Sequence, residues 1–131
     1  MQVDFYEMGG RFNDPLLVTC ILVGKAWPDV KEIAIIGPHD QLEALDAALW
    51  RQPEGRFLPH DGKRAPIRLL EQAPERAALL INLDPTSPLP GGEYQRVLEI
   101  VPATEEAREP LRARWRAWSA KGVTLNHHAL K

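Results

Sequence analysis

The sequence of 131 residues contains one cysteine and no long hydrophobic run. Cys20 has no second cysteine for an internal disulfide, and its apolar neighbours predict a small buried side chain in a reducing compartment. The longest apolar run, residues 16–23, contains Thr19 and is far shorter than the ~20 residues that cross a bilayer. It also follows too many acidic residues to be a secretory signal. We therefore expect a soluble, cytoplasmic protein without membrane contacts.

A large excess of charge of either sign is also absent. The chain has 16 Lys and Arg against 18 Asp and Glu, a net charge of −2, which provides no global attraction to nucleic acid or anionic membranes. Hydrophobic residues make up 44% and charged residues 26%, as in average globular proteins, so we expect neither disorder nor a fibrous repeat. A chain of this length predicts one domain, residues 1–131, with a single core.

The motifs of common nucleotide-binding sites are missing. Gly24-Lys25 fails as a phosphate-binding loop because Thr19 stands five residues before the glycine and Ala26 follows the lysine. Neither of the glycine pairs at 9–10 and 91–92 extends to the dinucleotide-binding motif. We therefore expect no cofactor, although a small nucleotide-dependent α/β enzyme remains the alternative function.

Metal-binding and catalytic patterns are missing as well. The histidines at 39, 60, 127 and 128 show no spacing to another histidine, cysteine or acid that converges ligands on a metal. His127 and His128 lie near the end of the sequence, where we expect solvated imidazoles. The serines occur in no nucleophile motif. We therefore expect no metal and no catalytic residue.

The spacing of apolar residues predicts an alternation of strands and helices. The expected strands span residues 3–7, 33–36, 67–70, 79–83 and 97–101, and the expected helices span 15–27, 40–52 and 104–122. Residues 33–36 are apolar at every position, which is typical of a strand buried on both faces. The alternation favours a three-layer α/β fold with a mostly parallel sheet and helices on both faces.

The last expected helix concentrates the positive charge. Residues 104–131 hold six basic and three acidic side chains, a net charge of +3, and the remainder therefore carries −5. A helical projection separates an apolar stripe, Ala107, Leu111 and Trp118, from a basic stripe, Arg108, Arg112 and Arg116, with Trp115 at the border. An aromatic ring beside arginines suits a peptide that combines a hydrophobic side chain with carboxylates. Alternatively, the tryptophans belong to the core and the arginines only lie on the solvated face of the helix. Pro110 lies within the expected helix and is predicted to kink or restart it.

A second feature is the proline-containing segment after the second expected helix. Trp50 lies on the flank of that helix, and Phe57 follows between Pro53 and Pro59. These side chains fit an exposed apolar patch that contacts a protein partner. A loop folded over a small satellite core fits the same pattern equally well.

Four segments carry patterns that are specific in combination: Ala48-Leu49-Trp50 with Pro53, Phe57 and Pro59-His60; Leu80–Leu83; Val97–Val101; and Arg112 with Arg114-Trp115-Arg116, Trp118 and Gly122. In this order they resemble the chi subunit family of bacterial DNA polymerase III. The resemblance implies a Rossmann-like fold without a nucleotide site and a non-enzymatic accessory subunit of the clamp-loader complex. It also implies two partners: a psi subunit, in a 1:1 heterodimer, and the acidic, Phe-terminated C-terminal tail of single-stranded DNA-binding protein, with only indirect association with DNA.

The resemblance assigns residues to both surfaces. The psi-facing surface would comprise Trp50, Pro53, Phe57, Pro59 and His60. The tail-binding site would comprise Arg108, Arg112, Trp115 and Arg116, with Val101, Leu111 and Val123 as apolar lining. Tryptophan stands here where the family has tyrosine, and Pro110 makes Arg108 the weakest of these assignments. Direct binding of single-stranded DNA by the basic helix is a further alternative, against which the acidic remainder of the chain argues.

Overall fold

The computed structural model describes residues 1–10, 14–27, 29–30, 32–50, 66–84, 89–102 and 104–130, without the side chains of Trp50, Ala107 and Arg108. Within these residues the chain forms strands β1 (Gln2–Glu7), β2 (Ile33–Ile36), β3 (Ile67–Leu70), β4 (Arg76–Asn82), β5 (Glu93–Val101) and β6 (Thr124–Ala129). It also forms helices α1 (Pro15–Ala26), α2 (His39–Trp50) and α3 (Arg108–Ser119), and a short 3-10 turn, η1 (Glu105–Ala107). The described strands make one sheet in the order β3-β2-β4-β5-β1-β6.

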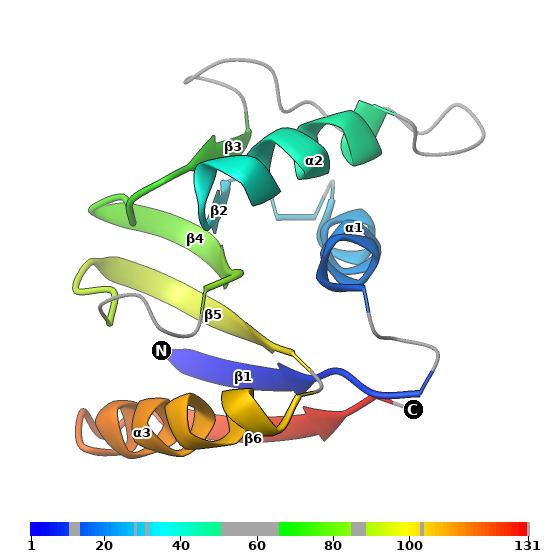
Figure 1. Cartoon of the computed structure of the whole chain (residues 1–131). Coiled ribbons are helices and arrows are strands. Elements are labelled where there is room, and N and C mark those ends of the chain that lie inside the picture. Colours follow the sequence, from blue (N-terminus) through cyan, green and yellow to red (C-terminus); the bar gives the residue numbers. More distant parts are fainter. Residues whose placement is uncertain are drawn as a thin grey trace.

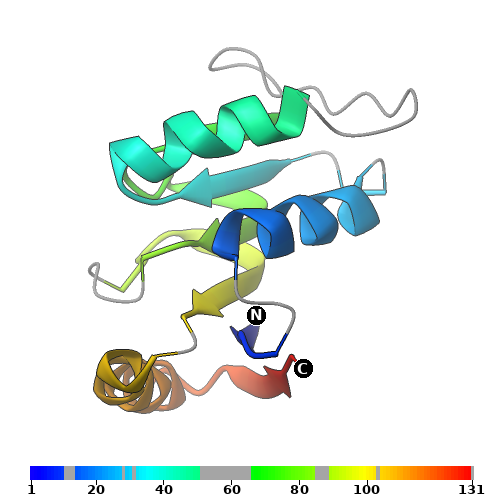
Figure 2. The same ribbon diagram turned by 45° about the vertical axis from the view of Figure 1, so that its right-hand side comes forward.

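The expected three-layer α/β fold is confirmed. Every strand pairing in the described part of the chain is parallel. Helices α1 and α2 pack together on one face of the sheet, and α3 covers the other face near β1 and β6 (Figures 1 and 2). Two buried clusters of apolar side chains therefore flank the sheet, one under α1 and α2 and the other under α3.

Helix α1 begins where the sequence predicts. The Leu16 amide donates a hydrogen bond to Asp14 Oδ1 at 3.0 Å, and Pro15 occupies the first helical position, where its missing N–H removes no intrahelical bond. Cys20 is buried as expected, and burial, with the nearby charge of Asp14, raises the pKa of its thiol. A buried thiol with a raised pKa is a packing residue rather than a nucleophile.

The last helix differs from its expected span of 104–122. The turn η1 precedes α3, which begins at Arg108 and ends at Ser119. Pro110 therefore lies in the first turn of α3, where its missing N–H removes no helical hydrogen bond. The helix restarts before the proline and is not kinked by it.

Strand β6 was not predicted. Its sequence, Thr-Leu-Asn-His-His-Ala, is mostly polar, yet it pairs in parallel with β1 along residues 124–129. His127 and His128 are exposed, as expected for solvated imidazoles, but both belong to this strand and each is bound to a carboxylate. His127 Nε2 lies 2.9 Å from Glu7 Oε2, and His128 Nε2 lies 3.0 Å from Asp4 Oδ1.

Asp4 is the fully buried carboxylate of this part of the sheet. It accepts hydrogen bonds from Arg96 Nε at 2.7 Å, from His128, and from Gln2 Nε2 at 3.1 Å. Burial on its own raises the pKa of Asp4, but these hydrogen bonds and the charge of Arg96 outweigh it and hold the pKa below its usual value. The ion pair thus joins β1, β5 and β6 on the face opposite α3.

The structure also bears on the expectations about metal-binding histidines and membrane contacts. His39 Nε2 lies 3.2 Å from Glu43 Oε1, one helical turn away, so the expectation that no histidine stands at this spacing from an acid is wrong. Both side chains are exposed, and no group of three or more potential metal ligands occurs among the described residues. In the same residues, no helix has the length and apolar character needed to span a membrane.

Candidate functional site

A buried ion pair sets the orientation of α3 on the sheet. Glu99 of β5 accepts hydrogen bonds from Arg114 Nε at 2.9 Å, from Trp118 Nε1 at 3.1 Å and from Asn82 Nδ2 at 2.9 Å. All four side chains are buried, and Trp118 is fully enclosed. Burial raises the pKa of Glu99, while the charge of Arg114 and the three hydrogen bonds act in the opposite direction without reversing it.

This contact divides the arginines of α3 into two kinds. Arg114 points into the protein and contributes nothing to the basic surface. Because successive residues rotate by about 100°, Arg112 and Arg116 both lie ~160° from Arg114 and ~40° from each other. Both are exposed, and the guanidinium of Arg116 lies 3.9 Å from Glu109 Oε1 on the helix surface. The buried contact between Arg114 and Glu99 therefore determines that Arg112 and Arg116 face outward.

A groove lies along this outward flank of α3, beside β6. It has a volume of about 440 Å³ and is lined mainly by apolar atoms; its lining residues are Leu111, Arg112, Trp115, Arg116 and His127. Trp115 is half-buried, and its ring packs on Phe5 of β1 with 5.1 Å between ring centroids. One face of the indole is thus held by the core while the rest of the ring borders the groove.

The structure brings four of the expected tail-binding residues together: Leu111, Arg112, Trp115 and Arg116. Val101 is instead buried in the core at 2% exposure, and Val123 is half-buried against the same core; neither lines the groove. The side chain of Arg108 lies outside the described part of the structure. The alternative that the tryptophans belong to the core holds for Trp118 but not for Trp115.

His127 is the lining residue that the sequence did not reveal. It reaches the groove because β6 returns beside β1, which sets His127 opposite Phe5 in the strand register. No local signal marks it, since the strand that carries it has no apolar alternation. Its carboxylate partner, Glu7, lies on the neighbouring strand and leaves the ring half exposed.

The expected psi-facing residues fall almost entirely outside the described structure. Trp50 ends α2, but its side chain is not described. Pro53, Phe57, Pro59 and His60 lie within residues 51–65, which are also not described. This surface therefore stays a prediction from the sequence.

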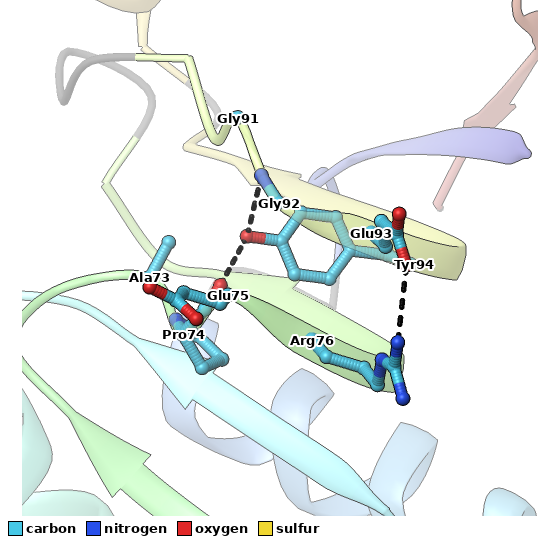
Figure 3. A pocket seen from close by; sticks show the side chains of 8 residues that line it. All are labelled: Ala73, Pro74, Glu75, Arg76, Gly91, Gly92, Glu93 and Tyr94. Carbon is cyan, nitrogen blue, oxygen red and sulfur yellow. Dashed lines mark hydrogen bonds and ion pairs between the residues drawn. The ribbon is translucent and has the colours of Figure 1, made fainter.

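A larger cavity, of about 590 Å³, lies at the amino ends of β4 and β5 (Figure 3). The Tyr94 hydroxyl donates to the Pro74 carbonyl at 2.6 Å and accepts from the Gly92 amide at 3.2 Å. Arg76 and Glu93 form an exposed ion pair at 3.4 Å across the same strands. These groups satisfy one another and join the two strand ends, so we assign them a structural role.

The nucleotide-dependent alternative would use the switch point of the sheet. In parallel α/β sheets, ligands bind where connections from adjacent strands leave toward opposite faces, and here that point lies at the carboxyl ends of β1 and β5. There the pairing of the strands continues one residue past β1 and β6: Met8 N donates to Val101 O at 3.0 Å, and Leu130 N donates to Glu7 O at 2.8 Å. Among the residues that the structure describes there, none forms a glycine-rich phosphate cradle, and the Glu7 carboxylate nearby repels phosphate.

Comparisons with known proteins identify relatives that match most of the chain. A family model described as DNA polymerase III chi subunit, HolC, matches residues 1–126. A protein of Pseudomonas aeruginosa named DNA polymerase III subunit chi is 31% identical and covers 98% of this chain and 96% of the relative. The protein of the same name from Escherichia coli K12 is 27% identical and covers 83% of this chain and 81% of the relative. The chain therefore belongs to the DNA polymerase III chi subunit family, whose members are accessory subunits of DNA replication.

Proposed function

We propose that the chain is a non-enzymatic adaptor of the clamp-loader complex that binds the acidic C-terminal tail of single-stranded DNA-binding protein. The observation that carries the proposal is the α3 groove, in which an apolar wall at Trp115 stands beside the exposed guanidinium groups of Arg112 and Arg116. Membership of the chi family supports the replication context.

The chemistry of the groove fits a peptide that ends in an aromatic residue. A guanidinium holds a terminal carboxylate through two parallel hydrogen bonds, and a second arginine is available for acidic residues that precede it. The terminal side chain then packs on Trp115 and Leu111, where the lining is apolar. The volume of about 440 Å³ falls in the range of roughly 300–1,000 Å³ that holds small ligands.

The distribution of charge restricts the ligand to a short anionic segment. Residues 104–131 carry a net +3 while the remainder of the chain carries −5, so a long polyanion would meet repulsion beyond α3. This favours a peptide over direct binding of single-stranded DNA, and it makes association with DNA indirect. Because the arginines are exposed, raising the salt concentration weakens binding.

The second partner in the proposal is a psi subunit, bound in a 1:1 heterodimer through Trp50, Pro53, Phe57, Pro59 and His60. The resemblance of this segment to the chi family supports it, and α2, which ends at Trp50, lies on the face opposite α3. An adaptor that acts in the cytoplasm would have to bind both partners without competition for one surface.

The experiment that tests the tail-binding site is a fluorescence titration with a labelled tail peptide. The double variant Arg112→Ala/Trp115→Ala removes one carboxylate-binding group and the aromatic wall, and we expect its affinity to fall by roughly 30-fold or more. Lys25→Ala, an exposed cation on α1, is the charge-matched control and should bind like the wild type. Unchanged affinity in the double variant would reject the groove as the site.

A further inference from the structure

Strand β6 is an exposed edge of the sheet, next to the α3 groove. In the strand order it has one neighbour, β1, which pairs with it along six residues, whereas the opposite edge strand, β3, is four residues long. Edge strands in natural proteins are commonly blocked by proline or lysine. Residues 124–129 contain neither.

The hydrogen bonds to β1 show which backbone groups of β6 face outward. Thr124 N donates to Met1 O at 3.3 Å and Leu130 N donates to Glu7 O at 2.8 Å. In a parallel pair, alternate residues direct both backbone groups toward the same neighbour, so the even-numbered residues face β1. Leu125, His127 and Ala129 therefore direct their N–H and C=O groups away from the sheet, where no partner occurs among the described residues.

These outward residues are continuous with the groove. The strand register sets Leu125 opposite Val3 and His127 opposite Phe5, and both partners belong to the core under α3. The side chains of Leu125 and His127 thus lie on the α3 face, and the ring of His127 lines the groove. One strand presents a groove wall and a row of backbone donors and acceptors together.

We propose that the acidic peptide in the α3 groove is bound in extended conformation as a seventh strand of the sheet, paired with β6. Its backbone exchanges hydrogen bonds with Leu125, His127 and Ala129, and alternate side chains point toward Trp115 and the arginines. The inference rests on the proposed function and specifies how that site binds its ligand. It explains how an open groove achieves affinity, because main-chain hydrogen bonds add to the contacts of a few side chains.

The charge of the groove favours an acidic peptide over a second copy of this chain. Two copies paired through β6 would bring Arg112 and Arg116 of one molecule toward the same basic flank of the other. The arginines of the two copies would repel one another, whereas the carboxylates of an acidic strand neutralise them. The proposal therefore predicts that the free chain does not dimerise through this edge.

A backbone N-methylation scan of the peptide tests the proposal without altering the protein. The probe is a synthetic acidic peptide that ends in phenylalanine with a free carboxyl group, methylated at one backbone nitrogen at a time. We expect methylation at every second position to weaken binding about fivefold or more, and the intervening positions to tolerate it. An effect that is uniform along the peptide, or absent from it, would overturn strand addition.

The scan separates failure of this inference from failure of the proposed function. If the unmethylated peptide does not bind at all, the proposed function fails. If the peptide binds and Arg112→Ala weakens that binding, but methylation at every second position has no special effect, only strand addition fails.

A protein variant provides an independent readout. Ala129→Pro removes an outward N–H and no hydrogen bond to β1, so the Ala129→Pro protein should bind the peptide severalfold more weakly than the Ala129→Val protein, while both melt at the temperature of the wild type. Equal peptide binding by these two folded variants would contradict the pairing with β6.

Discussion

The buried ion pair between Glu99 and Arg114 gives the sharpest prediction for stability. Among the described residues, Arg114 is the one cation bound to Glu99, a carboxylate that is 1% exposed, and Arg114→Met leaves it with the neutral donors of Trp118 and Asn82. Breaking one side of a buried pair costs about 3–5 kcal/mol. For a chain of this length, 1 kcal/mol shifts the melting temperature by roughly 3–4 °C, so we expect a decrease of about 10–20 °C.

Urea denaturation of three variants provides the assay. The double variant Arg114→Met/Glu99→Met replaces both charges by apolar side chains, and we expect it to recover part of the stability that Arg114→Met loses. Recovery is incomplete because the buried donors of Trp118 and Asn82 then lose the Glu99 acceptor. The control is Arg112→Met, which removes an exposed arginine of the same helix and should change stability by less than about 0.5 kcal/mol. A loss below about 1 kcal/mol in Arg114→Met, or a double variant less stable than the single one, would refute the reasoning.

The pH dependence of the same variant checks the cause. Burial already raises the pKa of Glu99 in the folded chain, and removal of Arg114 raises it further. The folded state then holds the proton more tightly than the unfolded state, so stability falls as the pH rises from the usual glutamate range through the raised pKa. The free energy of unfolding of Arg114→Met should therefore be closest to that of the wild type at low pH. A stability difference that stays constant across the pH range would contradict this explanation.

Three further predictions follow from other contacts. Glu109 lies 3.9 Å from Arg116 and competes with the acidic peptide for its guanidinium group, so Glu109→Gln should raise the affinity for the peptide about twofold in a fluorescence titration. Weaker peptide binding by this variant would contradict that competition. The lowered pKa of Asp4 contributes stability above pH ~4 that is lost as the pH falls through the folded value, so Asp4→Asn should flatten the acid limb of the unfolding curve. Gly92→Ala places a Cβ 2.5 Å from the Glu75 carbonyl oxygen and should cost about 1–3 kcal/mol in urea denaturation; Gly91→Ala, with open space around it, should be neutral.

Local signals were sufficient to predict the central elements of the fold. Residues 33–36 form a strand that is buried at every position, and the Asp14-Pro15 pair begins α1, because both patterns act within a few residues of sequence. The basic flank of α3 was likewise visible from the helical repeat, which set Arg112 and Arg116 beside Trp115. In each of these cases the sequence neighbours are also the structural neighbours.

Long-range contacts explain what the sequence did not predict. Strand β6 is polar, and its partner β1 lies at the other end of the chain, so no local alternation indicated it or brought His127 to the groove. The helical projection left Arg114 out of the basic stripe but gave no sign that it is buried, because a charged residue is normally solvated; only the position of Glu99 on β5 explains its burial. Val101 was expected in the groove, but the packing of α3 encloses it in the core.

The central claim is that the α3 groove holds a carboxylate-terminated acidic peptide. A crystal structure of this chain with the tail peptide of single-stranded DNA-binding protein tests it most directly. We predict the terminal carboxylate within hydrogen-bond distance of Arg112 or Arg116 and the terminal aromatic ring against Trp115. A peptide bound on the α1 and α2 face, or in the cavity beside Tyr94, with the α3 groove empty, would contradict the account.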